Sequence, residues 1–244
     1  MKPFLLLSAR PEPAAARGEY LAIAKFAGLT HSQLLSHPVI DVPVGGLDLG
    51  AYSGVILGGG PFNASDEDKS DTQLRVEADL AYVVDEVLSR EIGFLGLCYG
   101  VGVLTSSLGG LVERTYGEPP SGVVVRLTGD GQLDPLLDGV SDEFVAFVAH
   151  KEACTELPPG AVLLAEGDHC PVQMFRIGEH AYATQFHPEL DADALADRLR
   201  IYQNAGYFDP ESLSDLIQMA YSTPMTPAAH KVLSNFVARY AQSQ

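Results

Sequence analysis

Cys98 and His187 are the residues of this chain best suited to nucleophilic chemistry. Cys98 lies in Gly96-Leu97-Cys98-Tyr99-Gly100, after the strand-like run 91–97 and before an apolar stretch with helical spacing. A turn from strand to helix at this point exposes the thiol, and the N–H groups and positive dipole end of the helix favour its thiolate. The same arrangement with serine is called a nucleophile elbow. The sequence therefore predicts that Cys98 is a nucleophile.

A base and an acid that could orient it occur together much later, in Gln185-Phe186-His187-Pro188-Glu189. Histidine suits proton transfer near neutral pH, and a neighbouring carboxylate fixes its tautomer. His187 ends a strand-like segment, Pro188 stops strand pairing, and Glu189 can fold back onto the imidazole. These residue types predict a triad of Cys98, His187 and Glu189.

Two glycine-containing turns supply donors for negative charge that develops during the reaction. Attack on a carbonyl builds charge on its oxygen, which then needs N–H groups already aimed at it. The N–H of Tyr99 follows the nucleophile, and a second N–H comes from Gly59 or Gly60, after the strand-like segment 54–57. No Gly-Lys-Ser/Thr follows these glycines, so they do not match a phosphate-binding loop. We expect Tyr99, with Gly59 or Gly60, to form an oxyanion hole.

Buried strands alternate with helices in the first half of the chain. This pattern predicts an α/β fold with a mostly parallel, doubly wound open sheet and helices on both faces. Loops at the carboxyl ends of such strands gather at one edge, so the glycine turn and the Cys98 turn should face each other. After residue 110 the pattern changes to short strands, with a hairpin at Gly178-Glu179. We predict strands at 4–7, 39–42, 54–57, 91–97, 123–127, 144–149, 161–165, 172–176 and 180–186, and helices at 19–27, 72–89, 193–204, 211–221 and 227–241, besides the helix after Cys98.

Length and charge limit the class of protein. The chain has 244 residues, of which 46% are hydrophobic, and a formal net charge of −17, so nucleic acids and anionic membranes are unfavourable partners. The three cysteines lack Cys-x-x-Cys spacing, which favours a reducing compartment and no metal site. The apolar run 4–7 is too short for a signal peptide or a membrane span. We expect a cytoplasmic protein with one domain over 1–208 and a helical extension over 209–244 packed on it.

Three motifs, in family order, make the chain resemble a class I glutamine amidotransferase, in particular the glutaminase domain of the GMP synthetase type. They are Ile56-Leu57-Gly58-Gly59-Gly60-Pro61, Gly96-Leu97-Cys98-Tyr99-Gly100 with Gly109-Gly110 downstream, and Gln185-Phe186-His187-Pro188-Glu189. The resemblance covers about residues 4–206 and implies a flavodoxin-like fold and no cofactor. It also implies that Cys98, His187 and Glu189 hydrolyse the side-chain amide of glutamine. A γ-glutamyl thioester would form on Cys98, with ammonia as the leaving group.

Two places depart from the family pattern. Members usually carry glutamine four residues after the nucleophile, where it helps to hold the substrate, and this chain has Gly102 there. The family's Ser-His-Gly-Asp segment reads Ala149-His150-Lys151-Glu152 here. His150 and Glu152 are candidates for orienting or binding a substrate amine, and the alternative for His150 is that it merely ends a strand.

Three hypotheses for function follow. The leading one is an amidotransferase-like hydrolase of glutamine or a γ-glutamyl amide, a small-molecule substrate. Because the sequence contains neither a Ser-Gly-Gly-x-Asp-Ser loop nor a P-loop, we expect its ammonia to reach a separate synthetase or water. Gly102 favours a stand-alone γ-glutamyl peptidase with the same triad and a larger substrate. The third hypothesis is a regulatory subunit that activates a synthetase with little turnover of its own.

Overall fold

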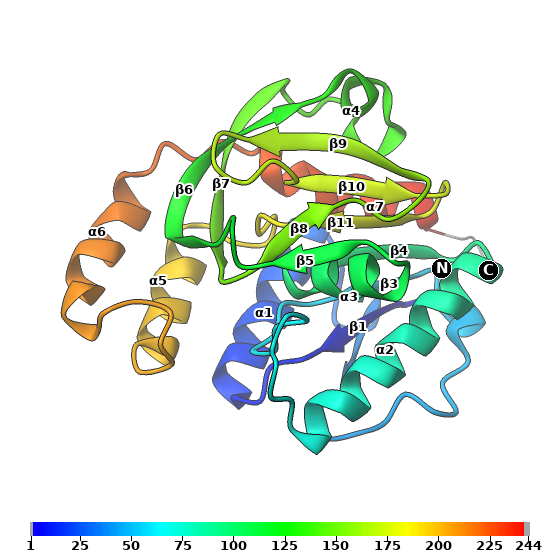
Figure 1. The fold of residues 1–244 in the computed structure, drawn as a ribbon. Coiled ribbons are helices and arrows are strands. Elements are labelled where there is room, and N and C mark those ends of the chain that lie inside the picture. The colour runs from blue at the N-terminus through cyan, green and yellow to red at the C-terminus, as the bar shows by residue number, and fades with distance from the viewer. Residues whose placement is uncertain (1, 242–244) are drawn as a thin grey trace.

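A nine-stranded mixed sheet runs through the computed structural model, which describes residues 2–241 (Figure 1). The strand order is β2-β1-β3-β4-β11-β10-β9-β6-β7. Its first five strands are parallel to one another. They are β2 (Leu34–Pro38), β1 (Phe4–Ser8), β3 (Gly54–Leu57), β4 (Gly93–Leu97) and β11 (Ala181–Thr184).

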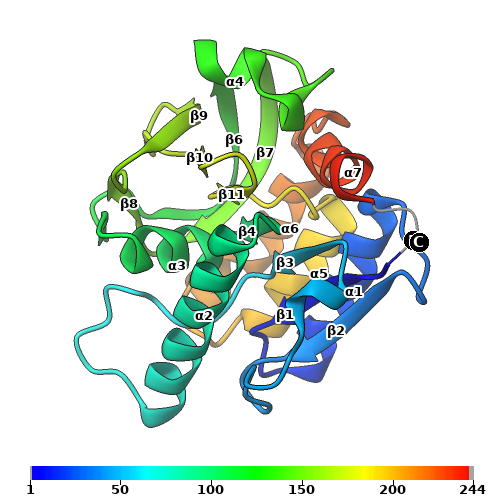
Figure 2. The same ribbon diagram turned by 90° about the vertical axis from the view of Figure 1, so that its right-hand side faces the viewer.

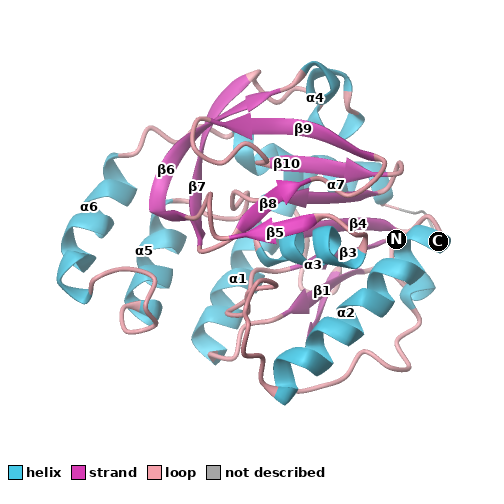
Figure 3. Cartoon of the chain, viewed as in Figure 1, coloured by secondary structure: helices cyan, strands magenta, loops and turns pink. Residues whose placement is uncertain are grey.

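The second part of the sheet is antiparallel. It adds β10 (Met174–Ile177), β9 (Ala161–Gly167), β6 (Glu118–Leu127) and β7 (Glu143–His150), while β5 (Leu111–Glu113) and β8 (Ala153–Glu156) form a separate two-stranded sheet (Figure 3). The predicted hairpin at Gly178 is confirmed, because β10 pairs antiparallel with β11 across this turn.

Helices cover both faces of the parallel part, as predicted (Figure 2). Alternate residues of β1 point to opposite faces, so Phe4 and Leu6 belong to one apolar cluster and Leu5 and Leu7 to another. The first cluster includes residues of α1 (Pro13–Ala27) and α7 (Ala228–Tyr240). The second includes residues of α2 (Asp71–Ser89) and α3 (Tyr99–Ser107). The predicted open α/β fold is therefore confirmed.

The remaining helices lie mainly in the second half of the chain. α5 (Ala192–Tyr202) and α6 (Leu213–Ser222) share a third apolar cluster with Phe147 of β7. α4 (Gly129–Leu133) and three short 3₁₀ helices, η1 (Leu49–Ala51), η2 (Pro135–Leu137) and η3 (Pro210–Ser212), complete the set among residues 2–241. None of the described helices combines the length and the apolar character needed to cross a bilayer.

The C-terminal helix α7 is part of the main core. Phe236 is fully buried and its ring centroid lies 5.9 Å from that of Phe4. The division into 1–208 and 209–244 stays a prediction, and residues 1 and 242–244 of those ranges lie outside the described residues.

Two predicted elements are wrong in position. The strand expected at 39–42 lies instead at Leu34–Pro38, where only Leu34 is buried. This edge strand has no apolar alternation to reveal it, and the buried Val39 belongs to the turn that follows. The helix expected from residue 19 begins at Pro13, because proline fits the first turn of a helix, where its missing N–H costs nothing.

Candidate active site

Cys98 occupies a sharp turn between β4 and α3. Its backbone has φ 51° and ψ −85°, a strained conformation for a residue with a Cβ. The N–H of Cys98 donates to the carbonyl of Thr184 at 2.7 Å, which ties the turn to β11. A Cβ on Gly96 would lie 2.8 Å from the Cα of Gly100, so glycine is required at position 96 for this close approach. The turn leaves Cys98 partly exposed at the carboxyl end of β4.

His187 and Glu189 lie beside this turn. The backbone N–H of His187 donates to the carbonyl of Phe147 in β7 at 2.9 Å. The imidazole Nδ1–H donates to Oε1 of Glu189 at 2.8 Å, which leaves Nε2 for another partner. His187 and Cys98 line the same pocket. The structure thus brings Cys98 to His187 and Glu189, which lie about 90 residues further along the chain.

Opposite charges set the protonation of the buried pair. Burial alone would lower the pKa of His187, but the negative charges of Glu189 and Cys98 outweigh it and raise this pKa to about 9. Burial would likewise raise the pKa of Glu189, but His187 and Arg198 hold it well below its usual range. At neutral pH the arrangement favours an imidazolium beside an ionised carboxylate.

Arg198, Glu19 and Arg10 support this pair, and no sequence motif marks Arg198 or Glu19 as part of the site. Arg198 of α5 places Nη1 3.0 Å from Oε1 of Glu189 and Nη2 4.0 Å from Oε1 of Glu19. Arg10 places Nε 3.1 Å from the same Glu19 oxygen. Glu19 is fully buried on the apolar face of α1. An acidic residue in such a position was the one sequence signal that could have pointed to these supporting residues. These residues link α1 and α5 to the acid of the candidate triad.

The candidate oxyanion donors differ in availability. The N–H of Gly59 donates to Oε1 of Glu19 at 3.1 Å, so the expectation that Gly59 offers a free donor is corrected. The N–H of Gly60 has no acceptor among residues 2–241, and Tyr99, as the first residue of α3, has none within its helix. A Cβ on Gly60 would lie 3.0 Å from Cδ1 of Tyr99, so the two turns face each other closely.

Two pockets meet at Cys98. The polar pocket includes Phe62, Asn63, Gly102, Lys151 and Glu152. The apolar pocket includes Arg10, His187, Leu190, Leu199, Tyr202 and Phe208. Gly60, Cys98, Ala149 and Tyr207 line both. The thiol therefore has distinct space on each of its two sides.

Glu152 fills the space that Gly102 leaves. A Cβ on Gly102 would lie 2.9 Å from Oε1 of Glu152, and this carboxylate accepts the N–H groups of Ala64 and Ser65 at 2.7 and 2.8 Å. The carboxylate thus occupies room that the missing side chain at Gly102, which favoured a larger substrate, would otherwise leave open.

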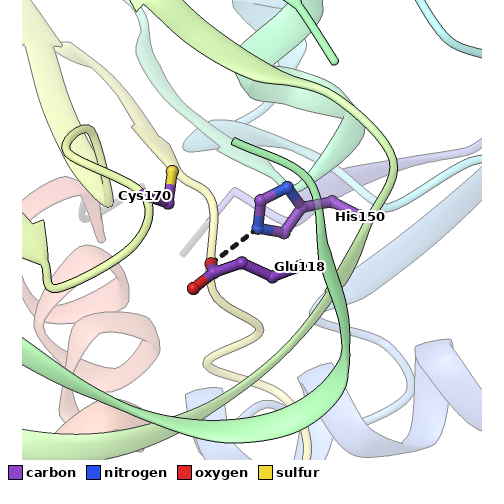
Figure 4. Close-up of side chains that lie close together, drawn as sticks. All are labelled: Glu118, His150 and Cys170. Carbon is purple, nitrogen blue, oxygen red and sulfur yellow. Dashed lines mark hydrogen bonds and ion pairs between the residues drawn. The ribbon is translucent and has the colours of Figure 1, made fainter. Parts of the chain in front are cut away.

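Both ring nitrogens of His150 have partners within the protein, and one of these partners is Glu118 (Figure 4). Its Nδ1 lies 2.8 Å from the carbonyl of Glu152 and its Nε2 lies 2.8 Å from Oε2 of Glu118. His150 lines the polar pocket and is the last residue of β7, and its role in orienting or binding a substrate stays a prediction.

Cys170 lies near the same pair, and one ligand atom from each of Glu118, His150 and Cys170 lies within 4.8 Å of the others. Gln173 also donates to Oε2 of Glu118 at 2.9 Å. A metal ion here would have to displace these hydrogen bonds, so the geometry fits a buried polar pair better than a metal site. Burial raises the pKa of Cys170 to about 12 and that of Cys154 above its ordinary value, which disfavours either thiol as a nucleophile.

The chain thus combines an open α/β sheet with a cysteine at a strand–helix turn that faces a histidine–glutamate pair. Comparison with known proteins identifies the family to which this arrangement belongs. Residues 38–199 match the family model for glutamine amidotransferase class-I. The chain belongs to the class-I glutamine amidotransferase family.

Related sequences and structures agree with this assignment. The chain is 29% identical over 194 residues to a GMP synthase [glutamine-hydrolyzing] of Lactobacillus delbrueckii, covering 78% of this chain and 34% of that protein. It is 34% identical over 145 residues to the one of Thermosynechococcus vestitus, covering 57% of this chain and 24% of that protein. The chain thus spans about a quarter to a third of the length of these relatives.

The fold is similar to that of a glutamine amidotransferase from Thermotoga maritima, with a TM-score of 0.77, 22% identity and full coverage of both chains. A glutamine amidotransferase from Methylobacillus flagellatus gives a TM-score of 0.70 at 18% identity, covering 100% of this chain and 97% of that one. At these identities the likeness concerns the fold alone.

Proposed function

We propose that this chain is a cysteine-dependent amidohydrolase that releases ammonia from the side-chain amide of glutamine. The observation that carries the proposal is the meeting of Cys98 with the buried pair of His187 and Glu189 at the carboxyl edge of the sheet. The curated relatives in the same family are named as glutamine-hydrolysing, which supports the same chemistry.

Each group has a role in the proposed reaction. The Cys98 thiolate attacks the amide carbon, and the N–H groups of Gly60 and Tyr99 hold the resulting oxyanion. The carbon–nitrogen bond then breaks as the His187 imidazolium gives its proton to nitrogen, and ammonia leaves. Water attacks the thioester with His187 as base, the carbon–sulfur bond breaks, and glutamate is released with the thiolate restored. Glu189 and Arg198 position the imidazole.

The polar pocket suits the charged end of a glutamine. The Glu152 carboxylate keeps acceptor capacity beyond its two backbone bonds and is proposed to receive the substrate ammonium. The Lys151 ammonium on the same pocket is proposed to face the substrate carboxylate. We further propose that the ammonia passes to a separate acceptor protein, a partner synthetase.

Assay of ammonia and glutamate released from glutamine by the purified chain tests this function. Cys98→Ala should lower kcat by roughly a thousandfold or more, because the thioester can no longer form. Cys154→Ala is the matched control and should retain activity, since that thiol is buried away from both pockets. Release that survives in Cys98→Ala would overturn the thioester mechanism. A wild-type chain that releases nothing and is not acylated would support the regulatory alternative.

A further inference from the structure

Only one of the two pockets at Cys98 contains His187, the proposed proton donor. His187 lines the apolar pocket and is absent from the lining of the polar pocket. This inference rests on the proposed function, in which the His187 imidazolium gives its proton to the nitrogen that leaves as the thioester forms. The leaving nitrogen therefore lies on the side of Cys98 that opens into the apolar pocket, and the glutamyl group lies in the polar pocket.

The apolar pocket is larger and less polar than ammonia requires. Leu190, Leu195 and Leu199 form one wall of it, and about 40 Å³ of it is free to the centre of a water-sized molecule, more than the roughly 10–15 Å³ that one such molecule needs. Ammonia is small and polar, so it gains nothing from an aliphatic wall. An alkyl or aryl group gains from the apolar surface that it removes from water.

Besides Arg10, Pro120 and Arg198, the pocket is lined by aromatic side chains from beyond the part of the chain that matches the family model. Tyr202, Tyr207 and Phe208 follow residue 199, where that match ends. Tyr202 is buried and Phe208 is half-buried. Lys151 places Nζ 4.4 Å from the Tyr207 ring centroid, which holds this ring where both pockets meet. This segment adds an aromatic cover to a site that the family domain already forms.

We propose that the apolar pocket binds the leaving amine, and that the preferred substrates are γ-glutamyl amides whose nitrogen carries an apolar alkyl or aryl group. Cys98 forms the same γ-glutamyl thioester, and the carbon–nitrogen bond breaks with proton transfer from His187. The product that leaves is then a primary amine, and water releases glutamate as before. Glutamine carries no such group on its amide nitrogen and therefore leaves the apolar pocket unfilled.

Two synthetic substrates test the proposal directly, γ-glutamyl-ethylamide and γ-glutamyl-hexylamide. Their leaving amines have nearly the same basicity, so a difference in kcat/KM reports the pocket and not the chemistry. We expect kcat/KM for the hexylamide to exceed that for the ethylamide by roughly tenfold or more, since each added methylene in a matching apolar pocket favours the transition state. A ratio of one or less would overturn the proposal.

Substitutions in the pocket test whether its aromatic side chains cause the preference for the longer amide. Phe208→Ala should reduce the hexylamide-to-ethylamide ratio, and Tyr207→Ala should do the same, with thermal unfolding used to check that both remain folded. Ile201→Ala is the matched control, because this neighbouring side chain is 36% exposed and lines neither pocket at Cys98. A ratio that is unchanged in both folded variants would overturn the assignment of the pocket.

The result separates this proposal from the proposed function. Cys98-dependent hydrolysis of glutamine and both amides with no preference for the longer amine leaves the amidohydrolase standing and removes the leaving-group pocket. An absence of hydrolysis of all three substrates, with no alkylation of Cys98 by a glutamine-mimicking diazo-ketone, removes both.

Discussion

His187 is held between opposite charges, and these decide which proton-transfer steps it can perform. Glu189 bonds its Nδ1 at 2.8 Å, and Arg198 reaches the same carboxylate oxygen at 3.0 Å. The negative partners outweigh the effect of burial and raise the pKa of His187 to about 9. The imidazolium needed to protonate a leaving nitrogen is therefore the main form at neutral pH.

A pH profile tests this reading at the residue scale. In the wild-type chain, kcat/KM for glutamine should fall as pH rises through about 9, where His187 loses its proton. Glu189→Gln removes a negative charge that favours the imidazolium, so the pKa of His187 should fall and the alkaline limb should move to lower pH. Glu143→Gln, at an exposed remote carboxylate, should leave the limb in place. An alkaline limb that does not move in Glu189→Gln would contradict the role of that carboxylate.

The strand–turn–helix element around Cys98 depends on close backbone approach at one of its two glycines. A Cβ on Gly96 would lie 2.8 Å from the Gly100 Cα, whereas a Cβ on Gly100 would meet only Leu57, at an ordinary 3.7 Å. The first glycine is therefore required to place α3 against β4, and the second has room for a methyl group.

Gly96→Ala and Gly100→Ala form a matched pair for this element. The first should force α3 away from β4, lower the free energy of unfolding by about 1–3 kcal/mol and misplace Cys98, with a large loss of kcat. The second should change the free energy of unfolding by less than about 1 kcal/mol, because its Cβ makes only ordinary contacts, at 3.7 Å or more. Denaturant unfolding and the ammonia assay measure both effects. Equal tolerance of the two substitutions would show that the close approach at residue 96 is unimportant.

The sequence predicted local elements better than contacts between distant segments. The strand at 54–57 and the elbow at Cys98 could be predicted because their signals lie within a few neighbouring residues. The edge strand β2 was misplaced because most of its side chains face solvent. The links from Glu19 to Arg10, Gly59 and Arg198 join segments far apart in the chain, so no local pattern announces them.

At the scale of the whole molecule, the sheet brings the proposed nucleophile and the proposed base, which lie far apart in the chain, to one edge. β4 carries Cys98 and its parallel neighbour β11 leads to His187, so the pairing of these two strands brings the two side chains to the same end of the sheet. α1 and α5 then supply Glu19 and Arg198 behind the histidine, and the segment after α5 covers the thiol with Tyr207. The site depends on the complete arrangement of layers and on no single motif.

The most direct measurement is the mass of the chain after reaction with a glutamine-mimicking diazo-ketone, followed by peptide mapping. We expect one adduct per chain, located on Cys98, lost in Cys98→Ala and formed more slowly in His187→Ala. Modification of Cys154 or Cys170 in place of Cys98, or no adduct on the folded chain, would contradict the proposed catalytic site.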